Sequence, residues 1–388
     1  MSLFGDEDIV YDDEREDDYD SPQSAVESQK LQEPKAMTFC LGHEEQENLF
    51  IDLFQKNSLP HAMIFSGNQG IGKTTMAFRL ARFLLKNGKV EDNQDSLFGG
   101  EDIQPDISSL DVAADDPVSA RIVSGGHADL LHIHRAFDTA KGKQDATLKV
   151  DALRKIEPFL RKTASEGGWR IVLVEDADTM NRSAQNAILK ILEEPPANVL
   201  IMLVAHRPGM LIPTIRSRAR VINFDPLSQD NMKDLLSRQG HYLSIEDMTT
   251  LSSLSEGSIG QALRYVEEGG LQTLSQILEY LETAPNWNWA RLHELSSSLS
   301  SPAQDKEYRM FADLMQWVFT QMLRTKARGG TDLPPALKGA GVSYFMVETP
   351  LERLITISDN LKKHFERVDF SNLDRRDAIR SCFLVISE

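Results

Sequence analysis

One glycine-rich segment has the residue types and the spacing that hold the phosphates of a nucleotide. It reads Gly67-x-x-x-x-Gly72-Lys73-Thr74, the full P-loop pattern. Glycines let successive backbone N–H groups converge on phosphate oxygens, while Lys73 can reach the β- and γ-phosphates and Thr74 can ligate Mg²⁺. We predict that a nucleotide binds here with Mg²⁺; the alternative is a loop that has kept the pattern but no longer binds. The predicted binding residues are Gly67, Gly70, Gly72, Lys73, Thr74 and Thr75.

An acidic pair stands where a P-loop enzyme needs a metal ligand and a base. Glu175 and Asp176 follow the continuous apolar run 171–174, and open α/β sheets bind their ligands at the carboxyl ends of such strands. We predict that this acidic pair supplies the carboxylate that holds the Mg²⁺ together with Thr74, and the group that acts as a base or positions water. The alternative is that both are loop carboxylates that cap the next helix.

Strands and helices alternate up to about residue 227. Apolar runs rich in β-branched residues predict strands at 63–65, 130–133, 170–174, 199–204 and 220–224. Helical spacing of apolar residues predicts helices at 42–57, from about Met76 to near Gly88, at 151–165 and at 181–194, the last stopped by Pro195-Pro196. Such an alternation is typical of a parallel sheet covered by helices on both faces.

From about residue 228 the pattern is helical. Breaks near Gly257, 269–270 and Pro285 predict a small helical unit at 228–268 and a larger one at 275–388. The predicted fold class is therefore α/β followed by all-α. One apolar stripe is expected to be domain core or a packing seam between subunits; it contains Met310, Phe311, Met315, Trp317, Val318 and Met322.

The formal net charge of the chain is −17, and two acidic segments account for it. Residues 1–35 and residues 91–116 each have a net charge of −9, so the remainder is about neutral and has no basic stripe for DNA. Because dense like charge prevents burial of apolar surface, we predict a disordered acidic tail at 1–36; a specific docking peptide is the alternative. A polar loop insertion is predicted at 89–118.

Several classes of protein are excluded by absent signals. Cys40 and Cys382 are too few for a disulfide scaffold or a four-cysteine zinc site, so no zinc is expected. The acidic start has no basic region before an apolar core, so no signal peptide is expected. No apolar run reaches the about 18 residues that cross a membrane. We therefore expect a cytoplasmic protein without a membrane partner.

The motifs together resemble the AAA+ clamp-loader family of DNA replication over about residues 38–265. That family carries a P-loop, an acidic strand end, a helix that closes in Leu-Glu-Glu-Pro-Pro and a Ser-Arg-Cys motif. In this sequence the helix closes at 192–196 and Ser-Arg-Ala stands at 217–219. The resemblance implies an AAA+ P-loop domain at 37–227, a helical lid at 228–268 and a helical collar or oligomerisation domain at 275–388.

Within the family the chain is most similar to the delta-prime class of bacterial DNA polymerase III. The family's Asp-Glu pair is reversed as Glu175-Asp176, so the longer Glu175 stands in the metal position and the shorter Asp176 in the base position. Each carboxylate is thereby shifted by about one methylene, and displacements of about 1 Å can cost on the order of a hundredfold in rate. The family's lid motif Gly-x-x-Arg-x-Ala-Leu stands at 257–263 without its arginine, which Arg264 could replace from one turn further on. The resemblance therefore implies ATP binding with slow hydrolysis or none.

The resemblance also implies that Arg218 is an arginine finger that acts in the nucleotide site of a neighbouring subunit. A planar, permanently charged guanidinium can stabilise the charge that grows on a transferred phosphoryl group. The alternative is that Arg218 is a surface ion-pair residue. His206 falls near the position of the family's phosphate-sensing side chain. Because a lone histidine after a strand is usually a loop residue, we expect His206 to be a loop residue.

The function implied by the resemblance is that of a delta-prime-like subunit of the pentameric clamp loader in the DNA polymerase III holoenzyme. It would help to load the sliding clamp on primed DNA, with gamma/tau and delta subunits, the clamp and primer-template DNA as partners. Its own chemistry would be at most weak ATP hydrolysis, because nothing resembles a nucleotidyl-transfer site. The alternatives are a hydrolysing gamma/tau-like motor ATPase and a pure scaffold with a remnant P-loop.

Overall fold

A computed structural model describes most of the chain. The described residues are 33–88, 107–138, 143–166, 168–298, 305–330, 332–371 and 374–387. Most of the predicted acidic tail at 1–36 and of the predicted insertion at 89–118 therefore lies outside the described residues.

The centre of the α/β part is a five-stranded sheet in the order β2-β5-β6-β1-β7, in which all neighbours are parallel. Its strands are β1 (Ala62–Ser66), β2 (Leu130–Ile133), β5 (Arg170–Val174), β6 (Val199–Ala205) and β7 (Arg220–Asn223). Every residue of β1, β5 and β6 is buried, as expected for strands covered on both faces. The predicted parallel α/β fold is confirmed.

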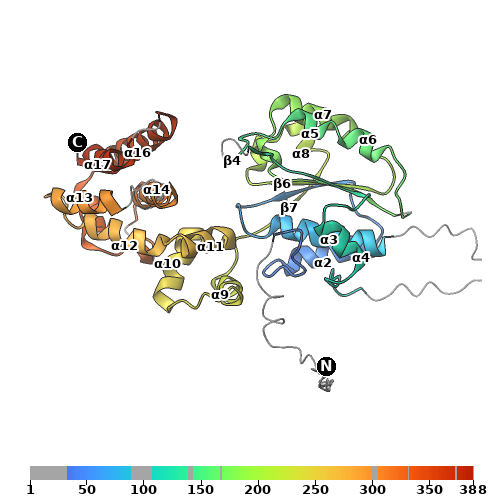
Figure 1. Cartoon of the computed structure of the whole chain (residues 1–388), viewed down its shortest axis with the longest axis horizontal. Coiled ribbons are helices and arrows are strands. Elements are labelled where there is room, and N and C mark those ends of the chain that lie inside the picture. Colours follow the sequence, from blue (N-terminus) through green and yellow to red (C-terminus); the bar gives the residue numbers. More distant parts are fainter. Residues whose placement is uncertain are drawn as a thin grey trace, which may run out of the picture.

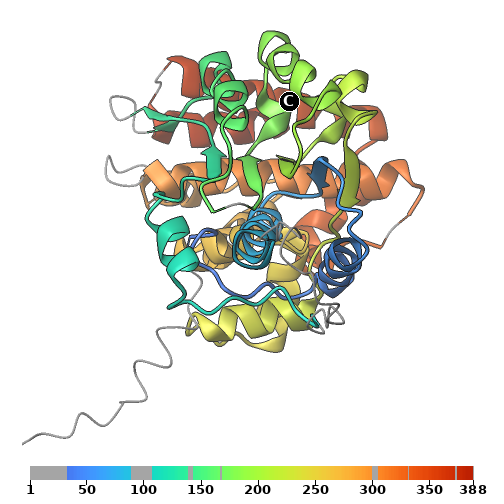
Figure 2. The same cartoon turned by 90° about the vertical axis from the view of Figure 1, so that its right-hand side faces the viewer.

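Helices cover both faces of the sheet (Figures 1 and 2). On one face lie α2 (Glu44–Gln55), α3 (Lys73–Asn87) and α4 (Pro117–Val123). On the other face lie α5 (Val150–Leu153), α6 (Ile156–Leu160), α7 (Arg182–Glu193) and α8 (Pro213–Arg216). Because successive side chains of a strand alternate, Met63 and Phe65 join the hydrophobic cluster of the first layer and Ile64 joins that of the second.

The single helix predicted at 151–165 is wrong. The structure has two short helices, α5 and α6, and no helix over 161–166. Pro158 explains the break, because it has no N–H to donate to the carbonyl of Arg154 and its ring obstructs the preceding turn. Pro158 is accommodated in the first turn of α6, where the N–H has no helical partner in any case.

The prediction of a loop as far as residue 118 is also wrong at its end, because α4 begins at Pro117. The carboxylate of Asp116 accepts a hydrogen bond from the N–H of Val118 at 2.9 Å and so caps the helix. A second element that the sequence did not predict is the hairpin of β3 (Phe137–Asp138) and β4 (Lys143–Gln144). Both elements are too short to have a clear periodic signal.

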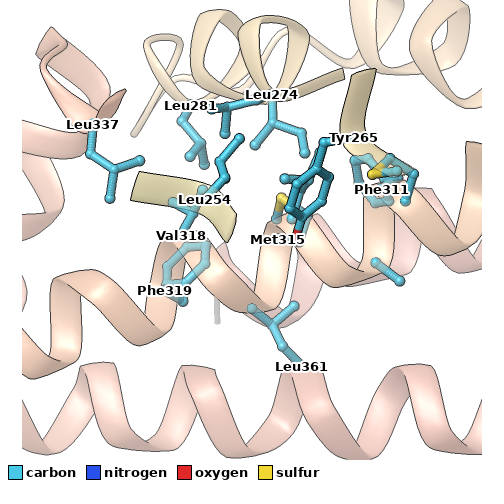
Figure 3. Close-up of a cluster of buried hydrophobic side chains, with 14 of the residues drawn as sticks. Leu254, Tyr265, Leu274, Leu281, Phe311, Met315, Val318, Phe319, Leu337 and Leu361 are labelled. Atoms are coloured by element: carbon cyan, nitrogen blue, oxygen red, sulfur yellow. The ribbon is translucent and has the colours of Figure 1, made fainter. Parts of the chain in front are cut away.

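The C-terminal part is built from helices, and no strand occurs in its described residues. Its helices are α9 (Gln229–Arg238), α10 (Ile245–Ser255), α11 (Ile259–Glu267), α12 (Gly270–Leu281), α13 (Trp289–Ser298), α14 (Asp305–Ala327), α15 (Ala340–Glu348), α16 (Leu351–Ser371) and α17 (Arg375–Ser387). One hydrophobic cluster runs through them from Leu227 to Ile386. Figure 3 shows part of this cluster, where Leu254 lies near Val318 and Tyr265 lies near Met315.

The apolar stripe of α14 belongs to this cluster. Met310, Phe311, Met315, Val318 and Met322 are all fully buried within the chain. Trp317, the sixth residue of the stripe, is partly buried and packs against the same cluster. The stripe is therefore core of the helical part. In the part of the chain that the structure describes, no helix combines the length and the apolar character needed to cross a bilayer.

Candidate functional site

The glycine-rich segment forms the turn between β1 and α3. Gly67, Gly70 and Gly72 have φ angles of 149°, 75° and 105°, a region that L side chains rarely adopt. Gly72 is the N-cap of α3, and no side chain caps this helix. The first N–H groups of α3 can therefore meet an anion at the positive end of the helix dipole. This backbone fits the phosphate groups of a nucleotide.

Lys73 lies almost entirely inside this turn, with 3% of its surface exposed. Its Nζ donates hydrogen bonds to the carbonyls of Gly67, at 2.7 Å, and Asn68. It also lies 3.1 Å from Nδ1 of His206. Burial lowers the pKa of Lys73 to about 8, against the opposing effect of nearby Asp178 and Asp176. The amine of Lys73 is thus hydrogen-bonded to groups of its own chain, and an incoming phosphate has to compete with these partners.

His206 connects Lys73 with the acidic pair. It follows the buried strand β6, and its Nε2 lies 2.7 Å from Oδ1 of Asp176. Because a carboxylate only accepts, Nε2 carries the proton, and Nδ1 of the neutral ring accepts from Lys73. His206 lies in the loop directly after β6, as expected, and from there its side chain contacts both Lys73 and Asp176.

Asp176 is held by two basic side chains. Besides His206, Nε of Arg135 donates to Oδ2 of Asp176 at 2.7 Å. Burial opposes the charged form, but the hydrogen bonds from His206 and Arg135 hold the pKa of Asp176 below its usual value. Sequence reasoning did not find Arg135, because it stands after the distant strand β2 and belongs to no motif.

Glu175 makes a separate contact. Its Oε1 lies 2.7 Å from Nε2 of His132, which is part of β2. Neither carboxylate caps a helix. Asp176 is the N-cap residue of the 3-10 helix η1 (Ala177–Thr179), but its side chain makes no cap hydrogen bond. Asn181 caps α7 by accepting from the N–H of Ala184 at 2.9 Å. The alternative that the pair consists only of helix caps is therefore wrong. Thr74 and Thr75, in the first turn of α3, are partly exposed.

Asp178 fixes the loop that contains His206. Its carboxylate is buried, and Oδ1 accepts from the N–H of His206 at 3.0 Å, while Oδ2 accepts from the N–H of Arg207 at 3.3 Å. Hydrogen bonds from backbone N–H groups satisfy a buried carboxylate that would otherwise be costly. Sequence reasoning did not single out Asp178, although the third acid in Glu-Asp-x-Asp was a visible signal.

The start of α11 rests directly on the P-loop. The N–H of Gly260 donates to the carbonyl of Gly70 at 3.1 Å. A Cβ added at Gly70 would lie 2.5 Å from Oγ of Ser258 and 3.2 Å from Cα of Gly260. This close backbone contact depends on two glycines, one of which stands where the family's lid motif has arginine.

Arg264 does not replace that missing arginine in this structure. Its Nη2 lies 2.6 Å from Oδ2 of Asp313 and its Nε lies 3.1 Å from Oε2 of Glu268. Both partners belong to the helical part. Their hydrogen bonds and negative charges raise the pKa of Arg264 despite its burial. The suggestion that Arg264 could reach the phosphates is therefore corrected, because its charge is used between α11 and α14.

Arg218 stands apart from the P-loop residues, just after α8. Its side chain is 36% exposed, and Nη2 lies 3.0 Å from Oε1 of Glu193. Nη1 donates to the carbonyl of Thr214 at 3.1 Å. Arg218 is therefore an ion-pair residue at the surface, as one alternative held. Its guanidinium is also accessible from outside, as a finger requires.

The structure gives no sign of a metal centre made by protein side chains alone. Among the described residues, no group of three or more His, Cys, Asp and Glu side chains could hold a metal ion. A Mg²⁺ ion that arrives with a nucleotide needs only one or two protein ligands besides phosphates and water. The hydroxyl of Thr74 and a nearby carboxylate are of the right chemistry for that role.

Comparisons with known proteins find relatives among the subunits of DNA polymerase III. Residues 42–228 match a family model described as DNA polymerase III, delta subunit. DNA polymerase III subunit delta' of Escherichia coli (strain K12) is 35% identical over 167 residues, 42% of this chain and 48% of that protein. The subunit delta' of Pseudomonas aeruginosa is 28% identical over 235 residues, 60% of this chain and 64% of that protein. The matches thus span about half to two thirds of the length of these relatives.

Solved structures similar to this chain include the crystal structure of a DNA polymerase III, gamma subunit-related protein from Thermotoga maritima. The two chains are 16% identical, and the TM-score is 0.38. The alignment covers 87% of this chain and 98% of that one.

Proposed function

Residues 42–228 belong to the AAA+ clamp-loader family, and from this premise we propose that the chain is a delta-prime-like subunit of a bacterial DNA polymerase III clamp loader. It binds ATP, hydrolyses it slowly or not at all, and gives Arg218 to the ATPase site of a neighbouring subunit. Its partners are gamma/tau and delta subunits, the sliding clamp and, through the assembly, primer-template DNA. It works in the cytoplasm during replication.

The observation that carries this proposal is the position of Arg218. Its guanidinium lies at the surface, where a neighbouring subunit can approach it, and its partners are the side chain of Glu193 and the carbonyl of Thr214. The guanidinium of an arginine finger has to be accessible at the surface of its own chain, because it stabilises charge in another subunit. A guanidinium buried in the core could not do so.

The chain's own acidic pair supports slow hydrolysis. A catalytic base has to accept a proton from water, and a lowered pKa makes it a poor acceptor. Both carboxylate oxygens of Asp176 already accept hydrogen bonds, from His206 and Arg135, and its pKa is lowered. Glu175 is engaged with His132. The missing arginine of the lid motif removes a further group that would contact phosphate.

Binding of ATP is supported by the backbone of the P-loop. Three glycines in the left-handed region, the uncapped start of α3 and the buried amine of Lys73 fit the phosphates. Thr74 and Glu175 would hold the Mg²⁺ that accompanies the nucleotide, and this ion would neutralise phosphate charge when bound. We assign the nucleotide domain to 37–227, the lid to 228–268 and the collar to 275–388.

A reconstituted clamp loader that carries Arg218→Ala tests the proposal. We expect ATP turnover of the assembly to fall, because one reaction centre loses its finger, while this subunit still binds ATP. Arg216→Ala is the matched control, because Arg216 is an exposed arginine of the same segment. Unchanged turnover with Arg218→Ala would refute the finger.

A second candidate function is that of a gamma/tau-like motor ATPase, which the intact P-loop with its buried Lys73 favours. Lys73→Ala separates the two functions. A motor would lose clamp loading with Lys73→Ala and keep it with Arg218→Ala. In a delta-prime-like subunit, Arg218→Ala impairs clamp loading more than Lys73→Ala does. If the purified chain binds no labelled ATP in the presence of Mg²⁺, the P-loop is a remnant and the subunit is a scaffold.

A further inference from the structure

The glutamates before Pro195-Pro196 have no part in the function proposed so far, although one of them touches the finger. Oε1 of Glu193 lies 3.0 Å from Nη2 of Arg218. We propose that Glu193 is a positioning residue, which holds the guanidinium of Arg218 in the orientation that a neighbouring subunit's nucleotide meets. The inference rests on the proposed function of Arg218 and deepens it.

The guanidinium is held from two elements. From the α8 segment, the carbonyl of Thr214 and Oγ of Ser217 lie 3.1 and 3.4 Å from Nη1. From the end of α7, Glu193 meets Nη2. A guanidinium has five N–H donors in a planar fork, so the fork can be fixed by these contacts and still donate outward.

Glu193 is itself placed by a rigid helix end. It is the last residue of α7, whose Ile188, Ile191 and Leu192 are buried in the second hydrophobic layer. Glu194 follows with φ −128° and ψ 68°, and the two prolines prevent the helix from continuing. The spacing of the motif thus fixes one carboxylate at the surface beside Arg218.

The strength of this contact suits positioning. Glu193 and Arg218 are 50% and 36% exposed, and exposed ion pairs are weak because water screens them. The contact therefore does not trap the guanidinium when a phosphate approaches. It does favour one orientation of a long side chain that otherwise samples many rotamers, and such preorganisation raises the rate of a reaction that needs defined geometry.

The test uses the full chain in a reconstituted clamp loader. Glu193→Gln removes the charge and keeps the size, and Glu194→Gln is the matched control on the adjacent exposed carboxylate. We expect Glu193→Gln to lower kcat at the site that Arg218 completes by about two- to fivefold, as for the loss of an exposed ion pair. KM for ATP stays the same, because the finger acts on the transition state. Glu194→Gln leaves both parameters unchanged.

The same two substitutions in an Arg218→Ala background make the test specific. If Glu193 acts through Arg218, Glu193→Gln causes no further loss there. A loss of equal size in that background would overturn the inference, because it would show an effect by another route. Faster turnover with Glu193→Gln would overturn it too, because Glu193 would then restrain the finger.

Failure of the inference can be told apart from failure of the proposed function. If Arg218→Ala lowers turnover while Glu193→Gln behaves like Glu194→Gln, the finger stands and the positioning role falls. If Arg218→Ala has no effect, the finger itself falls, and with it the role of Glu193. Co-purification of each variant with the other subunits in wild-type amounts shows that assembly is intact.

Discussion

The P-loop and the surface around Arg218 place a positive charge in opposite environments, one buried and one exposed. Lys73 is 3% exposed and its amine is surrounded by carbonyls and His206 of its own chain. Arg218 has a side chain that is 36% exposed, and its contacts leave it accessible from outside. A charge satisfied inside the chain serves that chain's own site, while an accessible guanidinium can serve a partner.

The acidic groups follow the same division. Asp176 and Asp178 are tied to groups of the same chain around Lys73. Glu193 is exposed and meets only the edge of the guanidinium. The first set of contacts stabilises a closed site, whereas the second leaves room for a ligand from another subunit. Four experiments test this contrast.

The largest effect is expected from Arg218→Lys in a reconstituted loader. Lysine keeps the charge but has no planar fork, so we expect turnover at the site that it completes to fall by about 10³-fold, the lower end for loss of an arginine finger. Steady-state ATPase assays measure this, with Arg216→Lys as the control. Near wild-type turnover with lysine would show that charge alone suffices.

The next effect concerns Cys40, which lies against the P-loop 3.8 Å from the carbonyl of Gly72. Burial raises the pKa of its thiol to about 12. Because the thiolate is the reactive form, we expect alkylation near pH 8 to be about 10³-fold slower than for an exposed cysteine introduced by Ser217→Cys. Mass-spectrometric mapping separates Cys40 from Cys382. Equal alkylation rates at Cys40 and at the cysteine introduced by Ser217→Cys would mean that solvent reaches the thiol of Cys40.

Gly70→Ala probes the contact between the P-loop and α11. Gly70 and Gly240 have φ angles of 75° and 83°, so alanine strains both by about 1 kcal/mol or more. Only at Gly70 would the new Cβ meet other atoms, Oγ of Ser258 at 2.5 Å, which adds about 1–3 kcal/mol. Chemical denaturation should therefore show a larger loss for Gly70→Ala than for Gly240→Ala. Equal losses would show that the contact does not form.

The smallest effect is expected from Asn181→Ala, which removes the N-cap of α7. We expect a loss of about 1 kcal/mol in stability, as for other N-caps. Turnover that depends on Arg218 should not change, because Glu193 lies at the opposite end of the helix. Ser183→Ala in the same turn is the control for thermal unfolding. A loss of turnover with Asn181→Ala would show that the finger depends on the whole helix.

Much of the sheet could be predicted because its strands are long apolar runs. Residues 170–174 are β5 as predicted, and 199–204 differ from β6 by one residue. The errors lie where one residue outweighs the periodic pattern. Pro158 divides the helix predicted at 151–165, and Asp116 with Pro117 starts a helix inside a predicted loop.

The P-loop follows from the local sequence, because the positive φ angles at Gly67, Gly70 and Gly72 each require a glycine at that position. The residues that surround the P-loop are brought there by the tertiary structure. The strand order β5-β6-β1 places the ends of three strands side by side, and so brings Asp176 and His206 to Lys73. Packing also pairs Arg218 with Glu193. Such contacts join residues far apart in the chain, and no local pattern encodes them.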